Sequence, residues 1–116
     1  PSESGGQSSG GPINLGTAPT ALVGLTWILD DGSPSDRLNF IDSANGSKTD
    51  IPTGTNSDSF TYTYNPTSIT EADLIITYAV GRWDEYKLNF DASSYIVTEY
   101  KEGVFDKLDA GVIKSG

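Results

Sequence analysis

The chain has 116 residues and a formal net charge of −9, from 16 acidic and seven basic residues. This length suits one domain with one hydrophobic core, and the acidity disfavours binding to nucleic acid or to anionic membranes, because both need a basic surface. Histidine and cysteine are absent, which excludes disulfides, histidine metal ligands, and the Ser/His and Cys/His forms of nucleophilic catalysis.

The first part of the chain has the composition of a linker. Residues 1–12 are rich in glycine and serine, and such a segment cannot bury enough apolar surface to offset the entropy lost on ordering. We therefore expect residues 1–20 to form a flexible tether and residues 21–116 to form a single domain.

The rest of the chain alternates between apolar and polar residues. A period of two predicts β-strands with one buried face and one solvated face. The alternation is clearest from Phe60 to Phe90, where three such runs with short polar connections indicate an antiparallel meander. In chain order, we expect strands at about 22–29, 37–42, 47–51, 57–64, 72–80, 85–90, 95–100 and 104–113. A helical turn over residues 105–110 is an alternative within the last strand.

Turn signals separate these strands. Residues 30–36 combine aspartate, serine, glycine and proline, which predicts a loop. Asn45-Gly46 is the strongest short-range hairpin signal, and we place a turn over residues 43–47. Residues 81–84 form another predicted turn, which contains Trp83.

Eight short antiparallel strands in sequence order can close into an up-and-down barrel, which removes exposed sheet edges. A two-sheet β-sandwich would satisfy the same alternation and is the alternative. The interior of an eight-stranded barrel is filled by side chains or holds one small ligand. The side chains expected to face inward are Leu25, Trp27, Leu29, Leu38, Phe40, Phe60, Tyr62, Tyr64, Leu74, Ile76, Tyr78, Tyr86, Leu88 and Phe90.

The start of the first predicted strand carries a family resemblance. The run from Leu22 to Trp27, after a flexible leader, resembles the opening of lipocalin-like domains, in which a glycine and a tryptophan close one end of the barrel. The Phe-x-Tyr-x-Tyr run at 60–64 and the later strands at 86–90 and 95–100 are similar to small lipocalin-like lipoproteins of gut Bacteroidetes. The resemblance covers about residues 21–114.

The chain also departs from the lipocalin pattern. Two residues, rather than one, separate Gly24 from Trp27, and the last strand offers Lys107 and Lys114 where the family often places an arginine over the tryptophan. The resemblance implies a secreted or cell-surface protein, an outer-membrane lipoprotein anchored through a lipidated cysteine upstream of Pro1. It would touch a membrane only through that anchor.

Five aromatic residues are candidate ligand contacts. Tyr62, Tyr64, Tyr78 and Tyr86 fall on the predicted inner face, where buried hydroxyls need partners. They would either line a partly polar pocket or reach water at the ends of the barrel. Trp83 lies beside charged residues, where it would either stack on a sugar or partner or fold back to cap the barrel.

The acidic residues suggest no further site. The carboxylates of residues 30–36 lack the spacing of a calcium loop, so we expect a solvated turn and no metal site. A glycosidase needs two carboxylates across a cleft, but the candidates fit outward strand faces or turns, and we expect neither catalytic residues nor a cofactor. These candidates are Asp84, Glu85, Asp91, Glu99 and Glu102.

Together these observations predict a non-enzymatic cell-envelope domain, a monomer that binds a small apolar ligand or an envelope protein. The alternative is a carbohydrate-binding or adhesion module of the β-sandwich type that uses exposed aromatics. A hydrolase with paired carboxylates is a third hypothesis, which two close carboxylates with raised pKa values in a cleft would favour.

Overall fold

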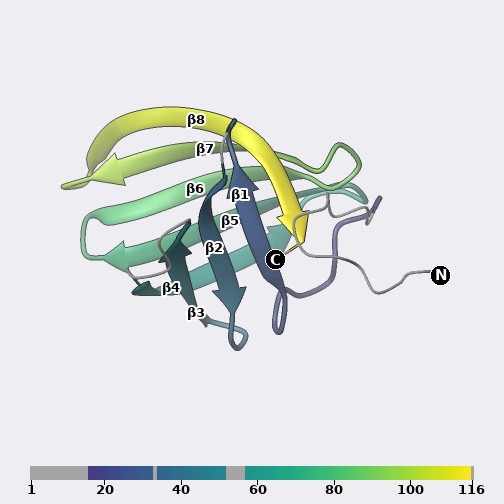
Figure 1. Cartoon of the computed structure of the whole chain (residues 1–116), viewed down its shortest axis with the longest axis horizontal. Coiled ribbons are helices and arrows are strands. Elements are labelled where there is room, and N and C mark those ends of the chain that lie inside the picture. The colour runs from purple at the N-terminus through teal and green to yellow at the C-terminus, as the bar shows by residue number, and fades with distance from the viewer. Residues whose placement is uncertain (1–15, 33, 52–56, 116) are drawn as a thin grey trace.

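Eight antiparallel strands form a closed barrel in the computed structural model, which describes residues 16–32, 34–51 and 57–115. Each strand pairs with the next, and in Figure 1 the last strand arches over the barrel to lie beside the first. The closed barrel confirms the predicted fold class, and the sandwich alternative is wrong. The strands are β1 (Thr26–Asp30), β2 (Pro34–Phe40), β3 (Asn45–Asp50), β4 (Ser57–Pro66), β5 (Glu71–Ala79), β6 (Arg82–Asn89), β7 (Ser94–Lys101) and β8 (Val104–Ser115).

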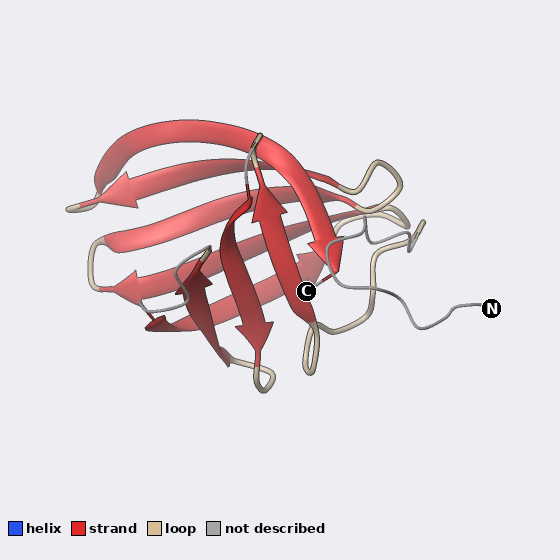
Figure 2. Cartoon of the chain, in the orientation of Figure 1, coloured by secondary structure: helices blue, strands red, loops and turns tan. Residues whose placement is uncertain are grey.

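The regular elements within the described residues are all strands, as the colouring of Figure 2 shows. The helical turn considered for residues 105–110 is therefore wrong, because these residues lie in β8 and pair with β7. In the described segments, no helix has the length and apolar character needed to cross a membrane.

Three strand starts lie three or four residues from the prediction. β2 begins at Pro34 rather than at residue 37, so the predicted loop over 30–36 is wrong for residues 34–36, which pair with β1. β1 begins at Thr26 rather than at residue 22, because the chain first turns: the Leu25 amide donates to the Leu22 carbonyl, and Gly24 has a φ of 84°. β6 begins at Arg82, so Trp83 lies in a strand and not in a turn. Turn-forming residues mark the right neighbourhoods, but strand pairing with neighbours decides where each strand starts.

The Asn45-Gly46 pair is not the hairpin turn. Both residues belong to β3, where Gly46 pairs with Phe40 on one side and Phe60 on the other. A Cβ atom on Gly46 would overlap the Phe60 ring and the Asn39 carbonyl. The glycine therefore serves close packing inside the barrel rather than turn geometry.

The β2–β3 turn lies earlier, at residues 41–44. Asp42 organises it: its Oδ1 accepts hydrogen bonds from the Ala44 amide at 2.9 Å and the Asn45 amide at 2.8 Å. An aspartate that accepts from amides two and three residues ahead is a common way to form a turn. The predicted turn over 43–47 is thus shifted by about two residues.

One end of the barrel is filled with aromatic rings. Trp27 is 2% exposed and lies between Phe40 and Phe90, with ring centroids 5.1 and 5.8 Å away. Phe40 in turn contacts Phe60 and Tyr62 at 6.0 and 5.0 Å. This edge-to-face packing gives the barrel a dense interior on this side.

The segment before β1 joins this core. Leu22 is buried, Ala18 packs against the core, and the Ala18 amide donates to the Ile69 carbonyl at 2.6 Å. The first 15 residues of the predicted tether lie outside the described residues.

Candidate functional site

At the end of the barrel away from Trp27, the inward-facing strand positions are occupied by charged residues rather than apolar ones. On β6 the inward positions run from Leu88 and Tyr86, both buried, to Asp84. On β7 they run from the buried Val97 to Glu99, which lies directly opposite Asp84 in the strand register. The expectation that these two carboxylates face outward or lie in turns is therefore wrong: the pleat points both into the barrel.

These side chains line a cavity of about 200 Å³, which we call the acidic cavity. Its lining is mostly charged, with five carboxylates against two lysines, and tyrosine and aliphatic side chains form its base. No set of three metal-binding side chains is arranged to hold an ion in the described part of the chain. The lining residues are Leu29, Asp31, Asp36, Lys48, Asp84, Tyr86, Tyr95, Val97, Glu99, Lys107 and Asp109.

A smaller cavity of about 150 Å³, the basic cavity, adjoins the first and shares Lys48, Asp84 and Glu99 with it. Its further lining residues are Tyr78, Arg82, Tyr100 and Lys101. Two of its cations are held over the ring of Tyr78: Lys48 Nζ lies 4.9 Å and Arg82 Cζ 5.0 Å from the ring centroid. Cation–π contacts of this kind restrict where the positive charges can lie.

The electrostatics of Asp84 are unusual for an aspartate. Its pKa is raised to about 6, chiefly by burial and next by the negative charge of Glu99, while the positive charges of Lys48 and Arg82 act in the opposite direction. Glu99 is also close to a cation, because Lys107 Nζ lies 3.9 Å from its Oε2. Asp84 therefore changes its charge near neutral pH, unlike an exposed aspartate.

The tyrosines beside the cavities keep their hydroxyl protons. Burial raises the pKa values of Tyr78 and Tyr86, so both hydroxyls stay protonated at neutral pH. Among the described residues, the Tyr78 hydroxyl is buried and has no hydrogen-bond partner. Buried polar atoms normally have a partner, so this hydroxyl is an exception, and it belongs to a residue that lines the basic cavity.

The structure separates the four predicted tyrosines into two groups. Tyr78 and Tyr86 line the charged cavities, whereas Tyr62 and Tyr64 line a different cavity of about 200 Å³. The Tyr62 hydroxyl donates to the Asp42 carbonyl at 2.6 Å, and the Tyr64 hydroxyl donates to the Pro19 carbonyl at 2.7 Å. The hydroxyls of this second pair therefore hold neighbouring backbone in place, and ligand binding by any of the four remains a prediction.

Trp83 lies on the outer side of β6, since Asp84 after it faces inward. Its ring stacks on that of Tyr100 with centroids 4.6 Å apart and planes at 11°, and its Nε1 donates to Glu85 at 2.9 Å. It does not fold back over the end of the barrel. Whether this outer pair binds a ligand also stays a prediction.

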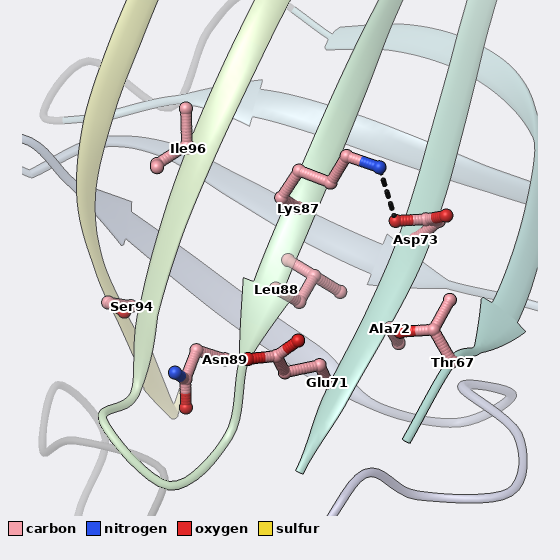
Figure 3. Close-up of a pocket in the computed structure, with 9 residues that line it drawn as sticks. All are labelled: Thr67, Glu71, Ala72, Asp73, Lys87, Leu88, Asn89, Ser94 and Ile96. Carbon is pink, nitrogen blue, oxygen red and sulfur yellow. Dashed lines mark hydrogen bonds and ion pairs between the residues drawn. The ribbon is translucent and has the colours of Figure 1, made fainter.

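A larger groove of about 390 Å³ lies on the outer face of β5, β6 and β7 (Figure 3). The figure shows Lys87 reaching toward Asp73, with Nζ 3.0 Å from Oδ1. Their side chains are 76% and 39% exposed, so water screens this ion pair. We favour the charged cavities despite their smaller volume, because four of their ionisable residues are partly withdrawn from water: Asp36, Lys48, Asp84 and Glu99.

The charged end was missed at the sequence level, although a signal for it was present. Asp84 lies two residues before Tyr86, Glu99 two after Val97, and Asp36 two before Leu38. Each therefore shares the inward face of its strand. Following the alternation past the last apolar residue would have found them.

Comparisons with known proteins identify a shared fold. No family model and no curated protein matches this chain. Among solved structures, the chain is similar to the crystal structure of a protein from Burkholderia vietnamiensis described as a putative β-lactamase, with a TM-score of 0.68 and 15% sequence identity. The match covers 86% of this chain and 100% of the other. At this identity it shows a common barrel fold and nothing of the activity.

Proposed function

We propose that this protein is a non-enzymatic binding domain whose ligand is a small polar molecule held at the charged end of the barrel. The observation that carries the proposal is the convergence of ionisable side chains from several strands on two adjoining cavities, while the other end is filled by aromatic rings. A polar ligand takes the place of the apolar one expected from the sequence. An apolar molecule would strip water from these carboxylates without replacing their hydrogen bonds.

Cavity size limits the ligand. Pockets for drug-sized molecules hold roughly 300–1,000 Å³, and the acidic cavity holds about 200 Å³. A molecule of a few heavy atoms with one or two charged groups fits this space. We further propose that the domain acts as a monomer at the cell surface. The resemblance to lipocalin-like lipoproteins supports the location, and a closed barrel without free strand edges supports the monomer.

The proposal can be tested by NMR on the 15N-labelled protein. A library of small amines, carboxylic acids and amino acids would be added, and the shifted amide signals mapped onto the structure. We expect the largest shifts at Lys48, Asp84 and Glu99, and their loss in a Glu99→Gln variant. Shifts confined to the outer groove at Asp73 and Lys87, or to the cavity at Tyr62 and Tyr64, would contradict the proposal.

A hydrolase is the second candidate function, because two carboxylates face each other in a cavity and one has a raised pKa. Such a pair can serve as general acid and base. The test is turnover of a chromogenic β-lactam and of 4-nitrophenyl glycosides. We expect no turnover; turnover with an apparent pKa near 6 that is lost in Asp84→Asn would replace the binding function with an enzymatic one.

A further inference from the structure

The two adjoining cavities differ in the sign of their charge. The groups found in the acidic cavity alone include Asp31, Asp36 and Asp109 against one lysine, Lys107. The charged groups found in the basic cavity alone are Arg82 and Lys101. Negative side chains therefore predominate in one cavity and positive side chains in the part of the other that it does not share.

The middle of the site is electrically mixed. Lys48, Asp84 and Glu99 border both cavities, so a molecule that passes from one cavity to the other meets charges of both signs. The Tyr78 ring holds the cations of Lys48 and Arg82 beside this midpoint. The positive end is thus partly preorganised before anything binds.

A singly charged molecule would use half of this arrangement. An amine would be attracted to the acidic cavity and repelled by Arg82, and a carboxylate would meet the reverse. A molecule with both charges can satisfy both ends, and charge-assisted hydrogen bonds are the stronger class of polar contact.

Building on the proposed function, we infer that the ligand is a small zwitterion of the amino-acid type, with its ammonium group in the acidic cavity and its carboxylate in the basic cavity. Asp36 on β2 and Asp109 on β8 face the ammonium group. Arg82 faces the carboxylate, and the Tyr78 ring restricts where its guanidinium group can lie.

The inference predicts a specific ranking of ligands in calorimetric titrations. The probes are glycine, β-alanine, 4-aminobutanoate and 6-aminohexanoate, which separate the two charges by increasing lengths of chain. n-Butylamine and butanoate are the matched molecules with one charge removed. We expect at least one zwitterion to bind about tenfold or more tightly than both singly charged analogues.

Variants identify which end binds which group. Arg82→Gln should weaken zwitterion binding about tenfold but should not weaken n-butylamine binding, because it removes a positive charge that repels the amine, whereas Asp36→Asn should weaken both. Lys87→Gln, on the outer face, is the control and should change neither. Circular dichroism would confirm that each variant is folded.

The outcomes separate the two proposals. If n-butylamine binds as tightly as every zwitterion and Arg82→Gln has no effect, the zwitterion inference fails while binding at the charged end stands. If no probe of either kind binds, or if binding survives both Asp36→Asn and Arg82→Gln, the charged cavities are not the site and both proposals fail.

Discussion

Trp27 and Trp83 lie on opposite faces of the barrel wall and differ in how deeply they are buried. Trp27 is packed among Phe40 and Phe90 inside the barrel, whereas Trp83 is half-buried on the outside and stacks on Tyr100. The assignment of Trp27 to the core is confirmed. That of Trp83 to a turn is wrong, because the strand pairing of β6 extends to Arg82.

The two tryptophans should differ in their contribution to stability. We expect Trp27→Ala to lower the free energy of unfolding by roughly 3–5 kcal/mol, since it leaves a cavity among buried rings. Trp83→Ala should cost far less, because it removes one partly exposed stacking contact and one side-chain hydrogen bond on the outside of the barrel. Urea denaturation of both variants measures the difference, and equal losses would contradict this assignment.

Asp84 should make stability depend on pH. Its pKa is raised from 3.8 to about 6 in the folded protein, so the folded state holds this proton more tightly than the unfolded state. Stability therefore falls as the pH rises from about 4 to about 6. We expect Asp84→Asn to be more stable than the wild type at pH 7, by on the order of 1–2 kcal/mol after allowing for solvent screening.

The measurement is thermal unfolding of wild type and Asp84→Asn between pH 3.5 and 8. The difference should shrink as the pH falls below about 6 and approach zero at the acid end of this range, where the carboxyl is mostly protonated in both states. Asp73→Asn, in an exposed ion pair, is the control and should show no stabilisation. A destabilised Asp84→Asn variant at pH 7 would show that the charged form is favoured in the fold.

At the scale of the element, the turn predicted at Asn45-Gly46 is instead part of β3. A glycine after an asparagine is typical of a hairpin turn, yet Gly46 lies within the strand. The reason is tertiary: the Phe60 ring and the Asn39 carbonyl occupy the space that a side chain would need. The local sequence indicates that Gly46 suits a turn, but it does not indicate that the Phe60 ring from β4 packs against it.

Gly46→Ala should therefore be destabilising even though alanine suits a regular strand better than glycine does. We expect a loss of about 1–3 kcal/mol, as for other overpacked interiors. Ser47→Ala, at the neighbouring half-buried position, is the control. Chemical denaturation of the two variants provides the comparison, and a stabilised Gly46→Ala variant would show that the interior can accommodate the extra methyl group.

At the scale of the whole molecule, the pairing of β1 with β8 closes the barrel. Ile113 is fully buried and pairs with Leu29, and Lys114 Nζ lies 2.6 Å from Asp30 Oδ2. This seam joins segments more than 80 residues apart. Its loss would expose two strand edges at once, so closure and the core depend on each other.

Adjacent residues on β8 test this dependence. Ile113→Ala should lower the free energy of unfolding by about 2–5 kcal/mol and increase hydrogen exchange in both β1 and β8. Val112→Ala, at the partly exposed neighbouring position, should change stability by about 0.5 kcal/mol. Increased exchange in β8 alone would indicate that the seam opens without loss of the rest of the barrel.

The alternation of residues was enough to predict the strands, their antiparallel order and most of the core, whereas closure into a barrel rather than a β-sandwich was decided by the pairing of β1 with β8. Alternation is a local property, because the pleat of a strand turns every second side chain to the same face whatever lies around it. The inward positions of Leu38, Ile76 and Leu88 follow directly from it, and all three are buried.

Only the tertiary structure decided where the charges meet. Asp36, Lys48, Asp84 and Glu99 lie on four different strands, and they share a cavity because the barrel closes and its pleats align. Barrel closure and strand register also separate the tyrosines between the two ends of the barrel. They likewise place the Phe60 ring against Gly46. A site formed by residues far apart in the chain depends on the register of every strand between them, and that register is set by packing across the barrel rather than by any single strand.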